Sequence, residues 1–444
     1  MPVEHTPLSD IPKIVAASRA TFLTKRTLPL EFRKEQLHAL ERLVLENEQE
    51  LLAAIYKDLH RPKDFELPTT LKAIQGALKD LEKLTADQKV EGPEKTDDCF
   101  VRLSPLGSVL VIGAWNYPIL LVLDPLAGAI AAGNTCIIKP SEVPEECASI
   151  LARLVPKYMD PTVVSVVSGG VEETTVLLNQ RFDHIFYTGG TEVGKIIMAA
   201  AAKNLTPVTL ELGGKCPVVV SKDADITKAG QTIAFWKAMN SGQVCLSVNY
   251  ILCPKNLQEP LIQTIIGTWK HLFGGSNGSG DFKDSADYPR IINKRQFDRL
   301  EKLLQKAKTQ NTLVFGGKSD ADELYMEPTI FTGVSVKDEI MKDEIFGPLL
   351  PIIDCETIDD AISIMNEQEH SLSVNVFTKN QEEINRLLLE TRSGALNIND
   401  IAAHFGHDKL PFGGVGHSGV GGYHGKYSIE TFSHKRAVMI RNLA

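Results

Sequence analysis

The feature that most constrains the fold is the alternation of short apolar segments with helix-like segments between residues 108 and 214. Helix-like stretches such as 120–132 and 144–158 separate the apolar segments. Short strands joined by helices of this length predict a parallel sheet with helical crossovers, and therefore an α/β fold. The predicted strands are SVLVIGAW (108–115), NTCIIKP (134–140), TVVSVVSGG (162–170), HIFYTGG (184–190) and TPVTLELGG (206–214).

The segments on either side of this alternation predict further parts of the molecule. Leucines at near-helical spacing, with charges between them, predict that the first 85 residues are mainly helical. Residues 84–98 are polar and charged and contain Gly92 and Pro93, which indicates an exposed excursion. A second α/β series begins near residue 228. A length of 444 residues suggests two or three domains.

Charge and hydropathy argue against two kinds of partner. The chain has 47 basic and 56 acidic residues and no Lys/Arg cluster that would follow a phosphate backbone, so we expect no nucleic-acid partner. The longest apolar stretch, 118–138, contains Asp124, Pro125 and Asn134, which would be costly to desolvate in lipid. We therefore expect no membrane span, and residues 1–10 lack the pattern of a secretory signal.

The seven cysteines predict a reducing environment. They are odd in number and scattered, and they form no C-x-x-C pair, so we expect free thiols and a cytoplasmic location. Cys136 and Cys253 lie in apolar runs, which predicts buried, unreactive thiols. No cluster of Cys, His, Asp and Glu has the spacing of a zinc site, so no metal is expected.

Two segments at strand ends suggest a nucleotide site, although each allows a simpler interpretation. Gly189 and Gly190 lie in FYTGGTEVGK, between a strand end and a helix start. Glycine there permits positive φ and a close backbone approach, and a helix N-terminus attracts phosphate; a plain strand-to-helix turn would have the same pattern. Lys139 and Glu142, in IIKPSE, follow another strand and could reach ribose hydroxyls or form a surface ion pair.

Three further residues have side chains suited to covalent catalysis. Cys245, in NSGQVC, could be an exposed nucleophilic thiol or a small apolar residue in a loop. Glu211, in PVTLEL, is a carboxylate in an apolar strand, where partial desolvation would raise its pKa toward that of a useful base, unless it points into water. Asn116, in AWNYP, could donate hydrogen bonds to an oxyanion or serve as a turn residue before a proline.

Together these segments resemble the aldehyde dehydrogenase superfamily, and within it the class 3 branch that includes fatty-aldehyde dehydrogenases. Seven motifs occur in the family order between residues 105 and 436, about three quarters of the chain. The short N-terminal region and the final YHGKYSIETFSH segment favour class 3 over the longer, tetrameric classes. The matching motifs are PLGSVLVIGAWNYP, IIKPSE, FDHIFYTGGTEVGK, TPVTLELGGK, NSGQVC, DEIFGPLLPI and PFGGVGHSGVGGYHGKYSIETFSHKR.

The resemblance implies a role for residues in these motifs. Cys245 would be the nucleophile and Glu211 the base that activates a deacylating water, while Asn116 would share an oxyanion hole with the backbone N–H of Cys245. Tyr117, Leu246 and the IAAHFGH segment (401–407) would line the substrate path. The residues expected beside the cofactor are Lys139, Glu142, Thr188, Gly189, Gly190, Gly194, Glu344 and Phe346.

The cofactor implied by the resemblance is NAD, bound in a modified Rossmann domain, and class 3 relatives often accept NADP as well. Lys139 would approach the adenosine ribose, whereas Glu344 and Phe346 would lie at the nicotinamide ribose. Glu142 should repel a 2′-phosphate, which favours NAD. The expected reaction is oxidation of an aliphatic or aromatic aldehyde to the carboxylic acid through a cysteine thiohemiacetal and a thioester.

The resemblance also implies how the chain is divided and assembled. Residues 1–83 and 105–210 would form an NAD(P)-binding domain, and residues 211–412 a catalytic domain of α/β type. Residues 84–104 and 413–444 would form a small β oligomerisation arm that bridges a homodimer by strand exchange.

One departure from the family pattern concerns the turn behind the nucleophile. Relatives commonly have C-x-x-P-D-Y there, whereas this chain has CLSVNY (245–250), which puts the shape of the pocket in question although the reacting groups are retained. Other interpretations of the same residues are a thiol esterase without dehydrogenase activity, a cofactor-bound scaffold, and acyl transfer to coenzyme A. The presence of Glu211 favours water over coenzyme A as the acyl acceptor.

Overall fold

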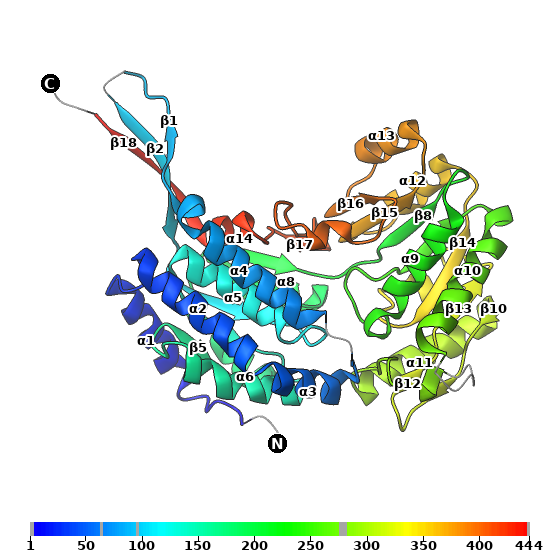
Figure 1. The fold of residues 1–444 in the computed structure, drawn as a ribbon, viewed down its shortest axis with the longest axis horizontal. Helices are drawn as coiled ribbons and strands as arrows, with labels where there is room; N and C mark the ends of the chain where they lie inside the picture. The colour runs from blue at the N-terminus through cyan, green and yellow to red at the C-terminus, as the bar shows by residue number, and fades with distance from the viewer. Residues whose placement is uncertain (1–3, 63–64, 95–96, 275–281, 442–444) are drawn as a thin grey trace.

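Two α/β parts built on separate sheets, together with a projecting β arm, make up the fold (Figure 1). The computed structural model describes residues 4–62, 65–94, 97–274 and 282–441. The α/β class predicted from the alternating pattern is confirmed.

The N-terminal region is helical, as its leucine spacing predicts. The apolar faces of these helices pack into the same core as the first sheet, through residues such as Leu37, Leu40, Leu43 and Ile55. Burial of one apolar face is what stabilises amphipathic helices of this length. The helices are α1 (Ile11–Leu23), α2 (Leu30–Glu46), α3 (Glu48–Leu59) and α4 (Glu66–Thr85).

The first sheet has six strands in the order β17-β7-β6-β3-β4-β5. Its strands run parallel except for β17, which pairs antiparallel with β7. The chain starts at β3, moves outward through β4 and β5, and then returns to β6 on the other side of β3. Such a reversal opens a ligand crevice at the carboxyl ends of the strands. The strands are β3 (Ser108–Ile112), β4 (Thr135–Lys139), β5 (Val164–Val166), β6 (His184–Thr188), β7 (Val208–Glu211) and β17 (Gly419–Val420).

The helices of this part complete the predicted crossovers. Every residue of α5 is buried, including Asp124 and Pro125, so the long apolar stretch of the sequence is a central helix and the strand that follows it. Within the described ranges, no helix is long and apolar enough to cross a membrane. The helices are α5 (Leu120–Ala132), α6 (Glu145–Tyr158), α7 (Val171–Leu178), α8 (Thr191–Ala202) and α14 (Lys426–Thr431).

The second sheet has seven strands in the order β10-β13-β14-β9-β8-β15-β16, parallel except for β10. Its strands are β8 (Pro217–Val220), β9 (Tyr250–Cys253), β10 (Thr312–Phe315), β13 (Thr329–Thr332), β14 (Leu349–Asp354), β15 (Ser373–Phe377) and β16 (Ala395–Ile398). The accompanying helices are α9 (Ile226–Ala238), α10 (Lys255–Phe273), α11 (Lys294–Gln310), α12 (Ile358–Asn366) and α13 (Gln381–Glu390). A small hairpin joins β11 (Ser319–Asp320) and β12 (Tyr325–Met326).

The arm is a three-stranded antiparallel sheet that projects from the first part (Figure 1). It consists of β1 (Gln88–Val90), β2 (Asp98–Pro105) and β18 (Ser433–Ile440). The last strand pairs with β2 along its whole length, from Ser433 opposite Pro105 to Ile440 opposite Asp98. The exposed excursion predicted from the polar sequence near residue 90 therefore lies in a strand-forming arm.

Packing of α5 should contribute strongly to stability, because it lies between the N-terminal helices and the first sheet. Leu126 is fully buried in this helix. We expect Leu126→Ala to lower the free energy of unfolding by about 2–5 kcal/mol, since the cavity left behind adds to the lost burial. Urea denaturation followed by circular dichroism would measure the change. As a matched control, Leu389→Ala on the exposed face of α13 should shift it by no more than about 0.5 kcal/mol.

Candidate active site

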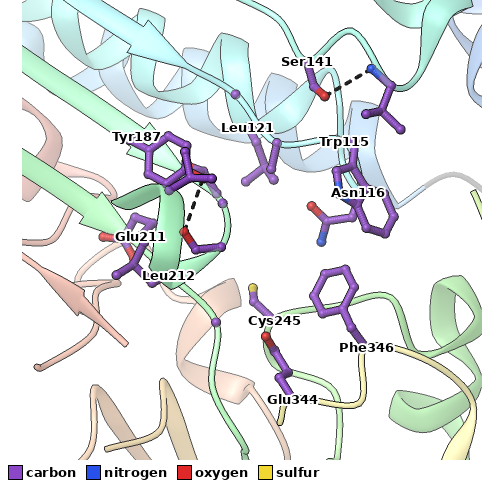
Figure 2. A pocket seen from close by; sticks show the side chains of 18 of the residues that line it. Trp115, Asn116, Leu121, Ser141, Tyr187, Glu211, Leu212, Cys245, Glu344 and Phe346 are labelled. Atoms are coloured by element: carbon purple, nitrogen blue, oxygen red, sulfur yellow. Dashed lines mark hydrogen bonds between the residues drawn. The ribbon is translucent and has the colours of Figure 1, made fainter. Parts of the chain in front are cut away.

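A cleft of about 1610 Å³ lies between the two α/β parts. Residues that follow β3, β4, β6 and β7 line one side, at the carboxyl ends of the first sheet. Residues 244–246, the first turns of α11 and residues 343–346 line the other side. The cleft therefore joins segments that are more than 200 residues apart in the sequence, and Figure 2 shows its central part.

The nucleophile candidate stands at the end of an unusual turn. A short 3-10 helix, Met239–Gly242, follows α9 and contains left-handed φ values at Asn240 (49°), Ser241 (53°) and Gly242 (72°). A Cβ on Gly242 would lie 2.3 Å from the carbonyl oxygen of Gly347, so only glycine fits there. This turn brings Cys245, which is partly exposed, to the wall of the cleft.

Asn116 is held beside this turn by shared hydrogen bonds. Its Nδ2 donates to the carbonyl oxygen of Gln243 at 3.1 Å, and Nδ2 of Asn240 donates to the same oxygen at 3.2 Å. The Asn116 amide and the Cys245 sulfur project into the same space from opposite walls (Figure 2). An amide nitrogen has two hydrogens, so one can bind Gln243 while the other is directed to an oxyanion formed at the sulfur.

Glu211, the last residue of β7, does not point into bulk water. Its side chain is 3% exposed, and neither carboxyl oxygen has a hydrogen-bond partner among the residues that the structure describes. Burial raises the pKa of this carboxyl well above its usual range. An unpaired buried carboxyl is costly to the fold, which points to a functional reason for its presence.

The Cys245 thiol is in surroundings that disfavour its anion. Burial is the main cause of its raised pKa, and the negative charges of Glu344 and Glu211 add to the effect. The protein alone therefore favours the neutral thiol. A cation bound in the cleft would oppose these effects and favour the thiolate.

The unusual CLSVNY turn is well supported by neighbouring groups. Lys237 Nζ donates to the carbonyl oxygen of Val248 at 2.8 Å, and the Asn249 side-chain oxygen accepts a hydrogen bond from the Ile345 N–H at 2.9 Å. The Cys216 thiol donates to the carbonyl oxygen of Cys245 at 3.3 Å. The departure from the family pattern thus leaves the nucleophile candidate at the cleft.

The glycine-rich turn after β6 forms part of the other end of the cleft. Gly189 and Gly190 line it, whereas Gly194 lies one turn into α8 and packs against Leu212. A Cβ on Gly189 would lie 2.1 Å from the Tyr187 hydroxyl oxygen. None of these three glycines has positive φ, so of the two properties for which the pattern suggests glycine, only the close approach of neighbouring groups applies here.

Several features of this end fit a nucleotide. Lys139 is buried and forms an ion pair with the partly exposed Glu142 at 2.7 Å, and both line the cleft. The Thr188 hydroxyl is buried without a hydrogen-bond partner in the described part of the chain. Space above Gly190 at the start of α8 is open, which suits a phosphate group. Exposed Val171, Val193 and Ile196 add an apolar wall.

Glu344 and Phe346 lie near the centre of the cleft (Figure 2). A Cβ on Gly213 would lie 2.1 Å from a Glu344 carboxylate oxygen, so glycine allows the carboxylate to approach the main chain. Burial raises the pKa of Glu344 to about 7. Phe346 has a left-handed φ of 47° and meets the Trp115 ring edge-on at 5.2 Å.

Apolar and aromatic side chains line one part of the cleft. Tyr117 and Leu246, predicted from the sequence to line the substrate path, lie there. Phe405, from the predicted segment 401–407, and Phe412, from the PFGGVGHSG motif, also line it. Sequence reasoning missed the other apolar lining residues, because they are isolated aromatic or aliphatic residues outside the motifs. They are Phe65, Leu120, Leu121 and Trp236.

Comparison with known proteins decides the family. A model described as the aldehyde dehydrogenase family matches residues 2–438. The chain belongs to the aldehyde dehydrogenase family. The solved structure of the substrate-bound state of Staphylococcus aureus AldH has a TM-score of 0.94 and 40% identity, covering 98% of this chain and 94% of that chain. The aldehyde dehydrogenase fold predicted from the motifs is therefore confirmed.

Curated relatives identify the branch of the aldehyde dehydrogenase family. Aldehyde dehydrogenase family 3 member A2 of Mus musculus is 47% identical over 96% of this chain and 87% of its own length. The dimeric NADP-preferring aldehyde dehydrogenase of Canis lupus familiaris is 44% identical over 98% of this chain and 96% of its own length. The protein is a class 3-like aldehyde dehydrogenase, an enzyme that oxidises aldehydes to acids with NAD(P)+.

The exposure of the cysteines predicts which thiol reacts first. Cys245 is partly exposed, whereas the other six cysteines are buried, Cys136 and Cys253 among them. We expect iodoacetamide to modify Cys245 before any other cysteine. The rate should keep rising with pH into the alkaline range, because burial raises the pKa of this thiol. Mass spectrometry of tryptic peptides would identify the modified residue, with Cys245→Ser as the control. If another cysteine is labelled early in both the parent enzyme and Cys245→Ser, the prediction is contradicted.

Proposed function

We propose that Cys245, Glu211 and Asn116 carry out the oxidation of an aliphatic or aromatic aldehyde through a thiohemiacetal and a thioester. The observation that supports this most is the buried carboxyl of Glu211, which has no hydrogen-bond partner in the described part of the chain and lines a cleft that also contains a partly exposed thiol. A thiol and a base lining one enclosed site are what a two-stage covalent mechanism requires.

The first stage forms and oxidises the covalent adduct. The Cys245 thiolate attacks the aldehyde carbon, a C–S bond forms, and the carbonyl oxygen becomes an oxyanion. The Asn116 amide and the backbone N–H of Cys245 donate hydrogen bonds to that oxygen. Bound NAD(P)+ supplies the hydride acceptor and a positive charge. Loss of hydride from the same carbon restores the C=O bond and leaves a thioester on Cys245.

The second stage releases the acid. Glu211 accepts a proton from a water molecule as that water attacks the thioester carbon. The C–S bond then breaks, the carboxylic acid leaves, and the Cys245 thiolate is restored. Glu211 has no competing hydrogen bond within the described ranges, so both carboxyl oxygens are available to a water.

We propose that Lys139, Glu142, Thr188, Gly189 and Gly190 hold the adenosine end of NAD(P)+. The Lys139–Glu142 pair suits ribose hydroxyls, because it offers a donor and acceptors together. The partly exposed carboxylate of Glu142 would repel a 2′-phosphate, which supports a preference for NAD over NADP.

At the other end of the cofactor, we propose that Glu344 binds the nicotinamide ribose and that Phe346 packs beside it. Gly194 would act indirectly, through its packing against Leu212. Tyr117 and Leu246 would contact the aldehyde, and their apolar surroundings favour an uncharged aliphatic or aromatic substrate.

We also propose the division of the chain into a cofactor domain (1–83 and 105–210), a catalytic domain (211–412) and bridging segments (84–104 and 413–444). A homodimer through the bridging segments is supported by the two open edges of the arm, β1 and β18. All seven cysteines are free, which supports a reducing, cytoplasmic location.

Replacing the proposed base should separate the two stages. We expect Glu211→Gln to release roughly one equivalent of NADH per site quickly and then to turn over slowly, since the thioester accumulates. In the parent enzyme, turnover should rise with pH as Glu211 ionises, at higher pH than for an ordinary glutamate, because burial raises its pKa. That rise should be absent in the variant. Rapid-mixing absorbance of NADH at several pH values would measure both effects.

Cys245→Ala serves as the matched control, and it should give neither the fast phase nor turnover. A steady rate without a fast phase in Glu211→Gln would contradict the role of Glu211 as the deacylating base. Activity toward p-nitrophenyl esters in the parent enzyme, with none toward aldehydes and NAD+, would favour the thiol esterase instead.

The proposed dimer predicts a particle of twice the chain mass. Sedimentation equilibrium should give twice 48.8 kDa for the parent enzyme. Ala437→Pro removes a backbone N–H and distorts β18, so it should increase the monomer fraction. A particle of 48.8 kDa for the parent enzyme would refute the homodimer.

A further inference from the structure

The position of the Asn116 amide depends on where its main chain is held. Asn116 lies in the turn between β3 and α5, and its carbonyl oxygen accepts two hydrogen bonds. Asn240 Nδ2 donates one at 3.1 Å, from the turn that carries the nucleophile. Arg61 Nη1 donates the other at 3.0 Å, from the connection that follows α3. The second donor is a residue of the N-terminal helical region, outside every motif of the site.

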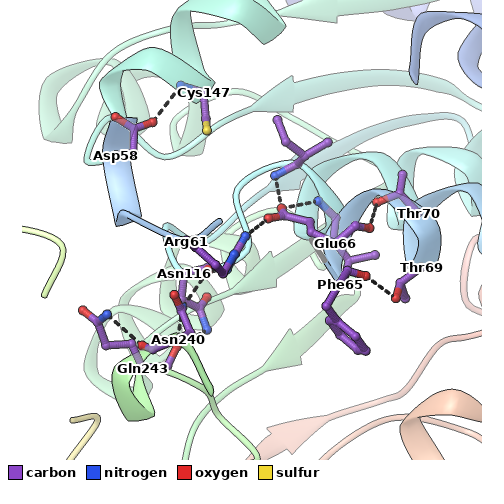
Figure 3. Close-up of polar contacts among 12 residues, drawn as sticks. Asp58, Arg61, Phe65, Glu66, Thr69, Thr70, Asn116, Cys147, Asn240 and Gln243 are labelled. Atoms are coloured by element: carbon purple, nitrogen blue, oxygen red, sulfur yellow. Dashed lines mark hydrogen bonds and ion pairs between the residues drawn. The ribbon is translucent and has the colours of Figure 1, made fainter. Parts of the chain in front are cut away.

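Arg61 is itself held by a buried carboxylate. Its guanidinium forms an ion pair with Glu66, and both side chains are almost wholly buried (Figure 3). Oε1 of Glu66 accepts hydrogen bonds from the backbone N–H groups of Ile119 at 2.5 Å and Leu120 at 2.8 Å. The pair therefore binds the Asn116 turn at both ends, with Arg61 on the turn itself and Glu66 on the start of α5.

The same pair supports the aldehyde end of the cleft. The Arg61 guanidinium lies over the Tyr117 ring, 4.5 Å from its centroid. The Tyr117 ring meets that of Phe65, the residue before Glu66, edge-on at 6.1 Å. Both rings line the cleft. Displacement of Arg61 would thus move the oxyanion donor and the adjacent wall together.

Stability alone does not account for a pair of this kind. Taking two charges out of water costs free energy that their attraction often only balances, and apolar replacements are frequently as stable. Here the guanidinium binds three groups at once: a carboxylate, a carbonyl oxygen and an aromatic face. Apolar residues in place of Arg61 and Glu66 would not hold the main chain of Asn116 in a fixed position.

We propose that Arg61 and Glu66 are positioning residues for the oxyanion hole, and that they act by fixing the main chain of Asn116. The inference rests on the proposed role of Asn116. Neither residue touches the reacting atoms. Their effect on the rate passes through the Asn116 amide, which must meet the oxyanion at hydrogen-bond distance.

The test compares the first turnover of Arg61→Met, Asn116→Ala and the double variant by stopped-flow NADH formation. Arg61→Met should slow it by about 10- to 100-fold, because a 1 Å displacement of a reacting group costs about 100-fold. In the Asn116→Ala background, the same replacement should change the rate less than about 3-fold, since two residues that act through one interaction do not have independent effects. If Arg61→Met fails to fold, Arg61→Lys and Glu66→Gln replace it in the same comparison. Each should slow the first turnover by a smaller factor, and that slowing should disappear in the Asn116→Ala background.

Asp58→Asn provides the matched control from the same part of the chain. Asp58 is a carboxylate of α3 that accepts hydrogen bonds from the backbone N–H groups of Glu146 and Cys147 at the start of α6 (Figure 3). Its replacement should lower the thermal midpoint and leave the first-turnover rate within about 2-fold of the parent, because surface and capping changes away from the site act on stability.

The possible outcomes distinguish the oxyanion role of Asn116 from the positioning role of Arg61 and Glu66. An unchanged first turnover in Arg61→Met, or equal losses in the presence and absence of the Asn116 amide, would overturn the positioning role while the oxyanion role stands. A first turnover that Asn116→Ala leaves unchanged would remove the oxyanion role and the positioning role with it. Loss in Arg61→Met that disappears in the Asn116→Ala background supports both.

Discussion

The hydrogen bond from the Asn116 amide to the Gln243 carbonyl oxygen is the contact on which the proposed catalytic arrangement depends. It joins the turn after β3 of the first sheet to the turn that carries Cys245 in the second part. The left-handed residues Asn240 to Gly242 give that turn its shape, and Asn240 binds both partners of the contact. The proposed nucleophile and oxyanion donor come from different parts of the fold, so their cooperation requires that this contact between the two parts be rigid.

Three ionisable groups of the cleft have pKa values that burial shifts in the same direction. Burial raises the pKa values of Glu211, Glu344 and Cys245. All three shifts favour the neutral forms of these groups, and a bound cation would oppose them. A pyridinium ring of NAD(P)+ has the sign that would favour the thiolate and the carboxylate together. In the proposed mechanism, binding of the cofactor and activation of the nucleophile are therefore two aspects of one event.

The N-terminal helices have a larger part in the site than their sequence indicates. Helical periodicity predicts these helices correctly, but it gives no reason to connect Arg61 or Glu66 with Asn116, which lies at least 50 residues further along the chain. For the glycine-rich turn, the pattern predicts the place of the residue but not the reason for it. Gly189 lies where the pattern places it, but it does not have positive φ, and the Tyr187 hydroxyl lies where a Cβ of residue 189 would be.

The sequence by itself determined the α/β class, the order of the strands along the chain, and the motifs that contain Cys245, Glu211 and Asn116. These follow from local periodicity and from residue types at strand ends, which are properties of short segments. Only the tertiary structure decided that Glu211 is buried with no hydrogen-bond partner among the described residues, that isolated aromatic residues gather into one apolar wall, and that Arg61 reaches the Asn116 turn. Burial and pairing depend on what distant segments bring to the same place, and no local pattern records that.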